Sequence, residues 1–270
     1  MPAYICETCG VQYAPTEQPP ERCIICEDER QYIGWQGQRW TTLEAMRAGE
    51  YRNQLEELES GLTAILTVPK VAIGQRAFFV QTVNGNLLWD CITYLDEATI
   101  QALRDRGGVQ AIAISHPHYY ATCVEWSQAF GEAPIYIHAA DRHWVTRPEG
   151  RYIFWDGETV EPVPGLGLVH LGGHFDGAAV CYWPAGAGCQ GVVLSGDTIQ
   201  VVQDRRWVSF MYSYPNLIPL SASKVEQIAA TMRRYPFRRL YGAFNGLNVL
   251  DEPDAVERSA RRYVQHLREE

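Results

Sequence analysis

The sequence predicts a layered α/β fold, in which helices cover a sheet or a pair of sheets, preceded by a small metal-held module. Two observations lead to this prediction. From about residue 61 onward, short β-rich runs alternate with helical segments. In front of them, four of the eight cysteines fall within the first 26 residues. With 270 residues, 46% of them hydrophobic and 20% charged, the chain is long enough for one large domain and a small module.

Acidic residues outnumber basic ones, with 32 Asp and Glu against 23 Lys and Arg, so the formal net charge is −9. This balance argues against nucleic acid as a partner, because phosphates attract basic surfaces. No apolar run reaches the roughly 18 residues that a membrane-spanning helix needs, and the start MPAYICETCG does not resemble an export signal. We therefore expect a cytoplasmic protein that contacts no membrane and keeps its cysteines reduced.

The front module, residues 1–40, holds its four cysteines as two pairs: Cys6-x-x-Cys9 and Cys23-x-x-Cys26. Two thiolate pairs on tight turns suit tetrahedral four-sulfur coordination, and Gly10 supplies a permissive backbone after the first pair. The segment resembles a zinc ribbon and is also similar to the rubredoxin-type modules that hold iron, although Glu27 stands where a glycine is usual. We expect structural Zn²⁺ at this site, with iron and electron transfer as the alternative.

A linking helix is expected next, over residues 41–60. Thr41 and Glu44 match a capping box. The apolar stripe that would follow it is incomplete. The body then begins at residue 61 and runs to residue 270.

Within the body, the β-rich runs and the helical segments follow one another closely. A turn signal at 84–86 predicts an antiparallel hairpin, and Ser223 with Glu226 predicts the start of a late helix. Residues 142–165 and 203–220 are expected to be pocket-lining loops. Strands are predicted at 62–68, 77–83, 87–90, 109–115, 134–138, 167–171, 178–183, 191–195 and 240–244, and helices at 96–106, 121–130, 223–235 and 253–269.

Histidines are concentrated, since six of the seven lie between residues 116 and 174. His116 and His118 follow a predicted buried strand, and Pro117 favours an extended backbone in which both side chains project to one side. His174 lies in a glycine-rich turn after a strand, and Asp197 directly follows another strand. The carboxyl ends of strands line the functional crevice of α/β sheets. Three imidazoles and a carboxylate suit zinc, iron or manganese.

The order HxH, GGH and GD, preceded by Asp90 in LLWD, resembles the metallo-β-lactamase fold superfamily, the αββα sandwich of binuclear hydrolases. The resemblance covers about residue 61 to the end. The resemblance is closest to a little-studied group of hydrolases that have an N-terminal zinc ribbon and sequence segments similar to GGHFDG, SGDTIQVV and FMYSYPNLIPL. It implies a role for Asp90 in orienting the site and four metal ligands: His116, His118, His174 and Asp197.

The family pattern is incomplete at its second metal position. HxHxDH would place aspartate at 120 and histidine at 121, where this chain has Tyr120 and Ala121. The family has a further histidine near the end of a late strand, and the corresponding segment here, YGAFN at 241–245, contains no histidine. We therefore expect a mononuclear site. The alternative is a replacement ligand recruited from another part of the cluster: His138, Asp141, His143, His170 or Asp176.

The resemblance implies a metal-dependent hydrolase in which a metal-bound hydroxide attacks a small-molecule thioester, ester or lactone. Asp197 would orient the water, and Tyr119 or Tyr120 would donate to an oxyanion. Active-site Zn²⁺ is expected, with iron as the alternative. Two other functions remain open: a mononuclear non-haem iron persulfide dioxygenase of the same superfamily, and a non-catalytic binding protein with a degenerate metal site. A homodimer is the default from base rates.

Overall fold

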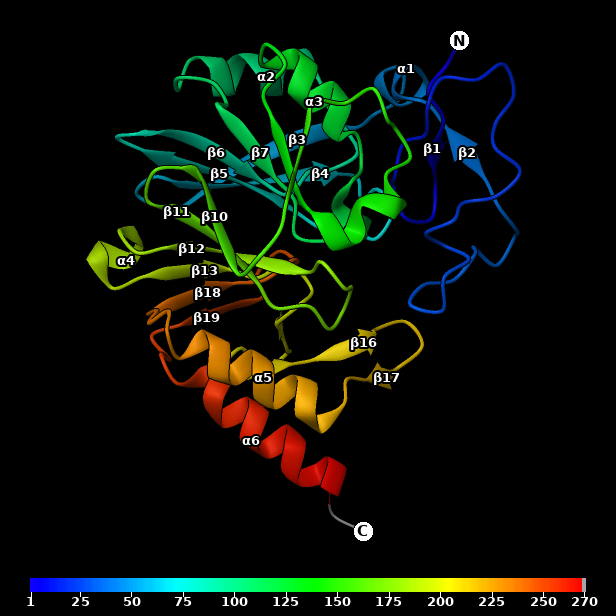
Figure 1. The fold of residues 1–270 in the computed structure, drawn as a ribbon. Coiled ribbons are helices and arrows are strands. Elements are labelled where there is room, and N and C mark those ends of the chain that lie inside the picture. The colour runs from blue at the N-terminus through cyan, green and yellow to red at the C-terminus, as the bar shows by residue number, and fades with distance from the viewer. Residues whose placement is uncertain (269–270) are drawn as a thin grey trace.

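The computed structural model describes residues 1–268, and its body consists of two β-sheets stacked face to face between layers of helices (Figure 1). The first sheet has seven strands in chain order, antiparallel from β3 to β6 and parallel from β6 to β9. These strands are β3 Arg52–Glu59, β4 Leu62–Val68, β5 Ala77–Thr82, β6 Gly85–Trp89, β7 Ala111–Ala113, β8 Ile135–His138 and β9 Tyr152–Trp155.

The second sheet has six strands in the order β10-β11-β12-β13-β18-β19, with one parallel pair between β13 and β18. Its strands are β10 Thr159–Val163, β11 Leu166–His170, β12 Ala179–Trp183, β13 Val192–Leu194, β18 Arg239–Tyr241 and β19 Asn248–Leu250. Apolar side chains from both sheets, among them Phe78, Trp89 and Leu194, fill the space between them. Sheets that are buried on both faces require helices on the outside.

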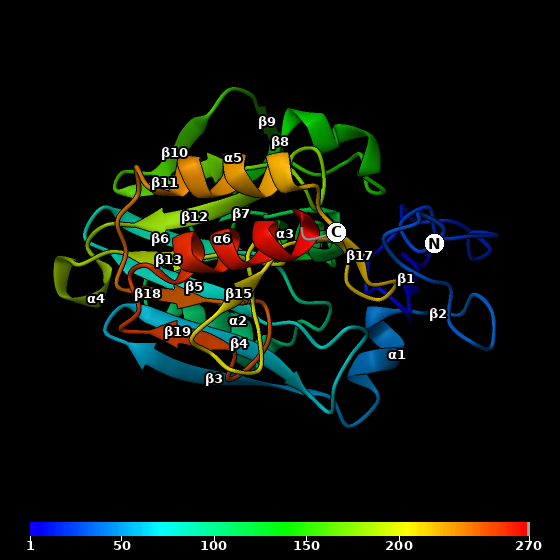
Figure 2. The same ribbon diagram turned by 90° about the horizontal axis from the view of Figure 1, so that it is seen from below.

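Helices α2 Glu97–Arg104 and α3 Cys123–Ala129 cover the outer face of the first sheet, and α5 Ala222–Met232 and α6 Ala255–Arg268 cover that of the second (Figure 1). Seen from below, α5 and α6 lie side by side across the second sheet (Figure 2). The predicted αββα sandwich is thereby confirmed. Within residues 1–268, no helix combines the length and the apolar character that crossing a membrane requires.

Shorter elements connect these layers and build the front module. The helical turns are α1 Leu43–Arg47, η1 Pro117–Tyr119, η2 Ala139–Trp144 and α4 Gly186–Cys189. Three small antiparallel pairs are β1 Ile5–Cys6 with β2 Trp40–Thr41, β14 Gln200–Val201 with β15 Val208–Ser209, and β16 Met211–Ser213 with β17 Ile218–Pro219.

The prediction of a helix over 41–60 is wrong for most of that range. Only Leu43–Arg47 is helical, with Thr42 rather than Thr41 as its N-cap, because the Thr42 hydroxyl accepts the N–H of Ala45 at 3.1 Å. Residues 52–59 instead pair along the whole of β4 as an edge strand. The segment RNQLEELE contains helix-forming residues, but pairing with an apolar strand outweighs that local preference.

Other differences are smaller. Helix α5 begins after Ser221, whose hydroxyl accepts the N–H of Lys224 at 3.3 Å, rather than at Ser223. The expected loop 142–165 contains β9 and all of β10, and the expected loop 203–220 contains β15, β16 and β17. The hairpin predicted near residue 84 is present between β5 and β6. Helix α6 is described as far as Arg268, and Glu269, the predicted end, lies outside the described residues.

Candidate metal centre

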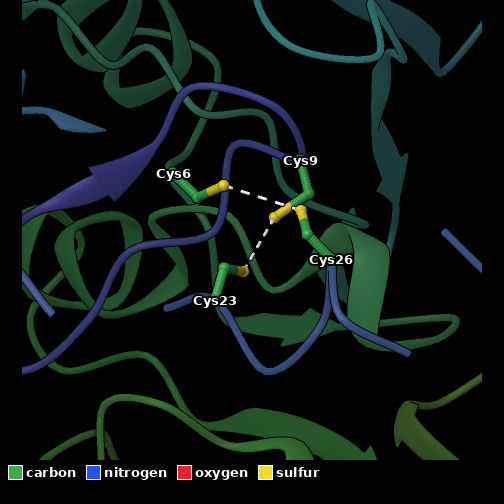
Figure 3. A group of neighbouring side chains, drawn as sticks. All are labelled: Cys6, Cys9, Cys23 and Cys26. Atoms are coloured by element: carbon green, nitrogen blue, oxygen red, sulfur yellow. Dashed lines mark hydrogen bonds between the residues drawn. The ribbon is translucent and has the colours of Figure 1, made fainter. Parts of the chain in front are cut away.

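The four cysteine side chains converge in the front module, as predicted (Figure 3). The Sγ atoms of Cys6 and Cys26 lie 3.6 Å apart, and those of Cys9 and Cys23 lie 3.7 Å apart. A tetrahedral site with Zn–S bonds of about 2.3 Å requires S···S separations of about 3.8 Å. All four cysteines are buried. The cluster is therefore shaped to hold one four-coordinate metal ion, with no position left for a substrate.

The module packs into the body rather than standing apart from it. Its cysteines share one apolar cluster with body residues such as Ile92 and Tyr119. Gly10 has a φ of +83°, and a Cβ there would lie 2.2 Å from Oγ1 of Thr93, so only glycine allows this approach. The Thr93 hydroxyl also donates to the carbonyl of Gly10 at 3.0 Å. Residues 1–40 and the sandwich therefore have a common core.

A second cluster lies at the edge of the sandwich, where four buried side chains bring their donor atoms within 4.8 Å of one another: His116, His118, His174 and Asp197. His116 follows β7, and His174 follows β11 after Gly172 and Gly173, whose φ angles are +65° and +94°. Asp197 follows β13 after Gly196. The prediction that these strand ends meet is confirmed. The backbone at 117–119 is, however, a 3-10 turn rather than the extended run expected from Pro117.

The donor atoms of this cluster fit a metal ion. His116 Nε2 lies 3.6 Å from Asp197 Oδ2, and His174 Nε2 lies 3.4 Å from His118 Nδ1. Within residues 1–268, His116 Nε2, His118 Nε2 and Asp197 Oδ1 are buried without a hydrogen-bond partner. Buried polar atoms without partners carry a desolvation cost, which a bound cation would remove at an atom that faces it, such as His116 Nε2. Three imidazoles and one carboxylate form a donor set suited to zinc or iron.

Neighbouring groups hold the ligands in place. The Oγ of Ser115 lies 2.8 Å from Nδ1 of His116, and the carboxylate of Asp90 accepts the N–H of Ser115 at 2.7 Å. The carbonyl of Met211 lies 3.1 Å from Nδ1 of His174. Metal-binding histidines commonly use their second nitrogen in this way. Asp90 therefore contacts the cluster through Ser115, and burial raises the pKa of its carboxyl well above the usual range.

Burial also sets the protonation state of two imidazoles, those of His118 and His174. It lowers the pKa of His118 well below its ordinary value and that of His174 to about 4, and the neighbouring His116 acts in the same direction. Both rings are therefore neutral at pH 7. A neutral imidazole has the lone pair that a metal ion requires.

The two tyrosines that follow the HxH motif use their hydroxyls within the fold. Tyr119 donates to the carbonyl of Ala243 at 3.3 Å, and Tyr120 donates to that of Asp141 at 2.9 Å. Both side chains are buried. The oxyanion role requires a hydroxyl that faces the substrate, whereas the Tyr120 hydroxyl faces a main-chain oxygen. That role stays a prediction.

Among residues 1–268, the second cluster includes none of the five replacement ligands considered from the sequence. His138 and His170 stack on each other with ring centroids 3.8 Å apart. Asp141 accepts the N–H of Gly177 at 2.8 Å. His143 and Asp176 are exposed. That the four-residue cluster holds a single metal ion stays a prediction.

Sequence reasoning missed three residues that surround the second cluster. Phe175 stacks on His116, with ring centroids 5.7 Å apart. The hydroxyl of Tyr214 donates to the carbonyl of Asp197 at 3.0 Å. Arg30, from the front module, donates through Nε to the carbonyl of His174 at 2.8 Å. No motif marks Arg30, whereas Tyr214 lies in the segment FMYSYPNLIPL and Phe175 in GGHFDG, where the resemblance assigned neither residue a role.

Comparisons with known proteins bear on the family and the fold. No family model matches the chain. Over its whole length it is 56% identical to the uncharacterized protein YmaE of Bacillus subtilis (strain 168), of which the match covers 98%. Among solved structures, it resembles the DIM-1 metallo-β-lactamase with a TM-score of 0.62 and 12% identity, over 81% of this chain and 100% of that one.

A metallo-β-lactamase from Pontibacter korlensis is similar to the chain with a TM-score of 0.56 and 16% identity, over 79% of this chain and 99% of that one. At such identities the two structures establish the fold and not the reaction. They match the αββα sandwich that the strand order already indicates.

Proposed function

Because this chain belongs to the same family as YmaE and has the metallo-β-lactamase fold, we propose that it is a hydrolase that uses one metal ion to cleave a small thioester, ester or lactone. One observation carries the proposal. Four buried side chains converge from separate strand ends, and three of their polar atoms lack any partner within the described residues.

When bound, the metal would supply Lewis acidity, which lowers the pKa of a water molecule from about 15.7 toward ~7 and polarises a carbonyl group. The protein supplies the orientation. His116 is held by Ser115, and His174 is held by the carbonyl of Met211. Asp197 has one carboxylate oxygen close to His116 and a second without a partner, which can accept a hydrogen bond from the attacking water.

The surroundings of the cluster favour substrates whose leaving group needs no proton from the protein. The hydroxyls of Tyr119 and Tyr120 donate to main-chain carbonyls, and burial raises the pKa of both phenols well above their usual range. A thiolate leaves without protonation, whereas an amine does not. Thioesters are therefore the first substrate class to test, and amides the least favoured.

Metal content and turnover on the full chain test the proposal. We expect one ion in each of the two clusters, and metal-dependent hydrolysis of a model thioester. His118→Ala should lose the ion of the second cluster and the activity while the cysteines keep theirs. His143→Ala is the matched control, because that histidine is exposed, and it should retain both ions and full activity.

Two outcomes would contradict the hydrolase. Model thioesters, esters and lactones that all show no metal-dependent turnover would exclude it. Iron in the histidine cluster together with oxygen consumption on a persulfide would favour the dioxygenase, since three histidines and a carboxylate also suit non-haem iron.

A further inference from the structure

Arg30 connects the four-cysteine module to the histidine cluster. Its guanidinium lies between two aromatic rings, 4.6 Å from the centroid of Phe175 and 4.3 Å from that of Tyr212. Its Nε donates to the carbonyl of His174 at 2.8 Å, and its Nη1 donates to both carboxylate oxygens of Asp28. Only 12% of the side chain is exposed. Asp28 balances its charge, so the side chain acts mainly through its shape and its hydrogen bonds.

The same segment of the module also holds the strand that faces the His174 ring. Strand β16 begins at Met211, whose carbonyl lies 3.1 Å from Nδ1 of His174. Two residues later, Ser213 donates through Oγ to the carbonyl of Arg30 at 3.0 Å. The side-chain amide of Asn216 donates to the carbonyls of Glu29 and Gln31, at 2.9 Å and 3.1 Å. Both groups that hold His174 are therefore tied to residues 28–31.

Residues 28–31 have no helix or strand to stabilise them. They begin two residues after Cys26, the last ligand of the cysteine cluster. The N–H of Glu27 closes the turn onto the carbonyl of Cys23 at 3.0 Å. A metal bound to Cys23 and Cys26 would constrain this turn, and residues 28–31 follow it directly.

We propose that Arg30 is a positioning residue for His174, and that through it the metal-loaded cysteine module sets the affinity of the histidine cluster for its own metal. This inference rests on the proposed metal site but not on the reaction carried out there. Arginine suits the position because its flat guanidinium can stack between two rings while donating along its edge. Lysine would keep the charge and lose both features.

Cobalt titration of the full chain tests the inference. Co²⁺ at the four cysteines gives a thiolate charge-transfer band, whereas Co²⁺ at the histidine cluster gives only weak visible bands, so each site is followed separately. Arg30→Ala should raise the dissociation constant of the histidine cluster by ~10 to 100-fold, as the loss of outer contacts does in other metal sites. The cysteine band should be unchanged, which also shows that the module remains folded.

Arg39→Ala is the matched control. Arg39 lies in the same module, is 58% exposed and pairs with Glu7 at 2.7 Å, so its removal should leave both dissociation constants unchanged. Arg30→Lys should weaken the histidine cluster nearly as much as alanine does. If Arg30→Ala does not fold, Asn216→Ala loosens residues 29–31 without touching the guanidinium and should raise the same constant several-fold.

An Arg30→Ala protein that binds Co²⁺ at the histidine cluster within twofold of the wild type would overturn the inference. So would a wild-type histidine cluster that binds no Co²⁺. Failure of every hydrolysis assay would remove the proposed reaction but would not change these binding constants, so the two proposals fail independently.

Discussion

Replacing Gly196 by alanine should disturb both the stability of the fold and the histidine cluster. Gly196 has a φ of +53° and lies between β13 and Asp197. A Cβ at this position would lie 2.7 Å from Oγ of Ser115 and 2.9 Å from its Cβ. Ser115 holds His116 through the same Oγ. The added methyl group therefore displaces a residue that orients a ligand.

Two destabilising contributions and one stabilising contribution set the change in the free energy of unfolding. A left-handed backbone costs a non-glycine residue about 1–2 kcal/mol. An added methyl in a packed site costs about 1–3 kcal/mol. Alanine also reduces the conformational entropy of the unfolded chain, which stabilises the folded state by about 0.4–1 kcal/mol. The net loss in the free energy of unfolding is therefore about 1–4.5 kcal/mol.

Gly131→Ala isolates the contribution of the contact with Ser115. Gly131 has a φ of +70°, and a Cβ there meets no atom within 4 Å, so it carries the backbone terms alone. Urea unfolding should show Gly196→Ala to be less stable than Gly131→Ala by about 1–3 kcal/mol. Cobalt titration should show roughly tenfold weaker binding at the histidine cluster only for Gly196→Ala. Equal stabilities and equal affinities in the two variants would refute the reasoning.

Three further predictions concern single groups. Ser115→Ala removes the partner of His116 Nδ1 and should weaken metal binding at that cluster about tenfold in a cobalt titration; an unchanged affinity would count against this partner. Cys23→Ser should lose one metal ion per chain by mass spectrometry and lower the melting temperature, whereas the exposed Cys189→Ser should do neither. Burial raises the pKa of Asp141 to about 7, above the unfolded value near 3.9. The unfolded state therefore loses its proton first, and stability falls as pH rises from about 4 to about 7, by up to ~1.4 kcal/mol per pH unit. Asp141→Asn should remove this dependence, and parallel stability curves for the two proteins from about pH 4.5 to 6.5 would contradict the assignment.

Much of the architecture could be predicted because apolar periodicity marks strands that are buried on their faces. The run 62–68 forms β4 over the predicted residues. The edge strand at 52–59 carries no such mark, since only one neighbour pairs with it and its polar residues also suit a helix. Caps were misplaced by one or two residues at Thr42 and Ser221 because several hydroxyls stand close together, and only the folded backbone selects one.

By itself, the sequence determined the two clusters of metal ligands. The spacing of Cys6-x-x-Cys9 and Cys23-x-x-Cys26 constrains each thiolate pair locally. The histidine-cluster ligands lie within a few residues of strand ends, which line one crevice in α/β sheets, and the family resemblance named the same four residues. Only the tertiary structure decided what surrounds them. Arg30 contacts His174 across 144 residues of sequence. Such a contact depends on how the module packs against the sandwich, and no local pattern records that packing.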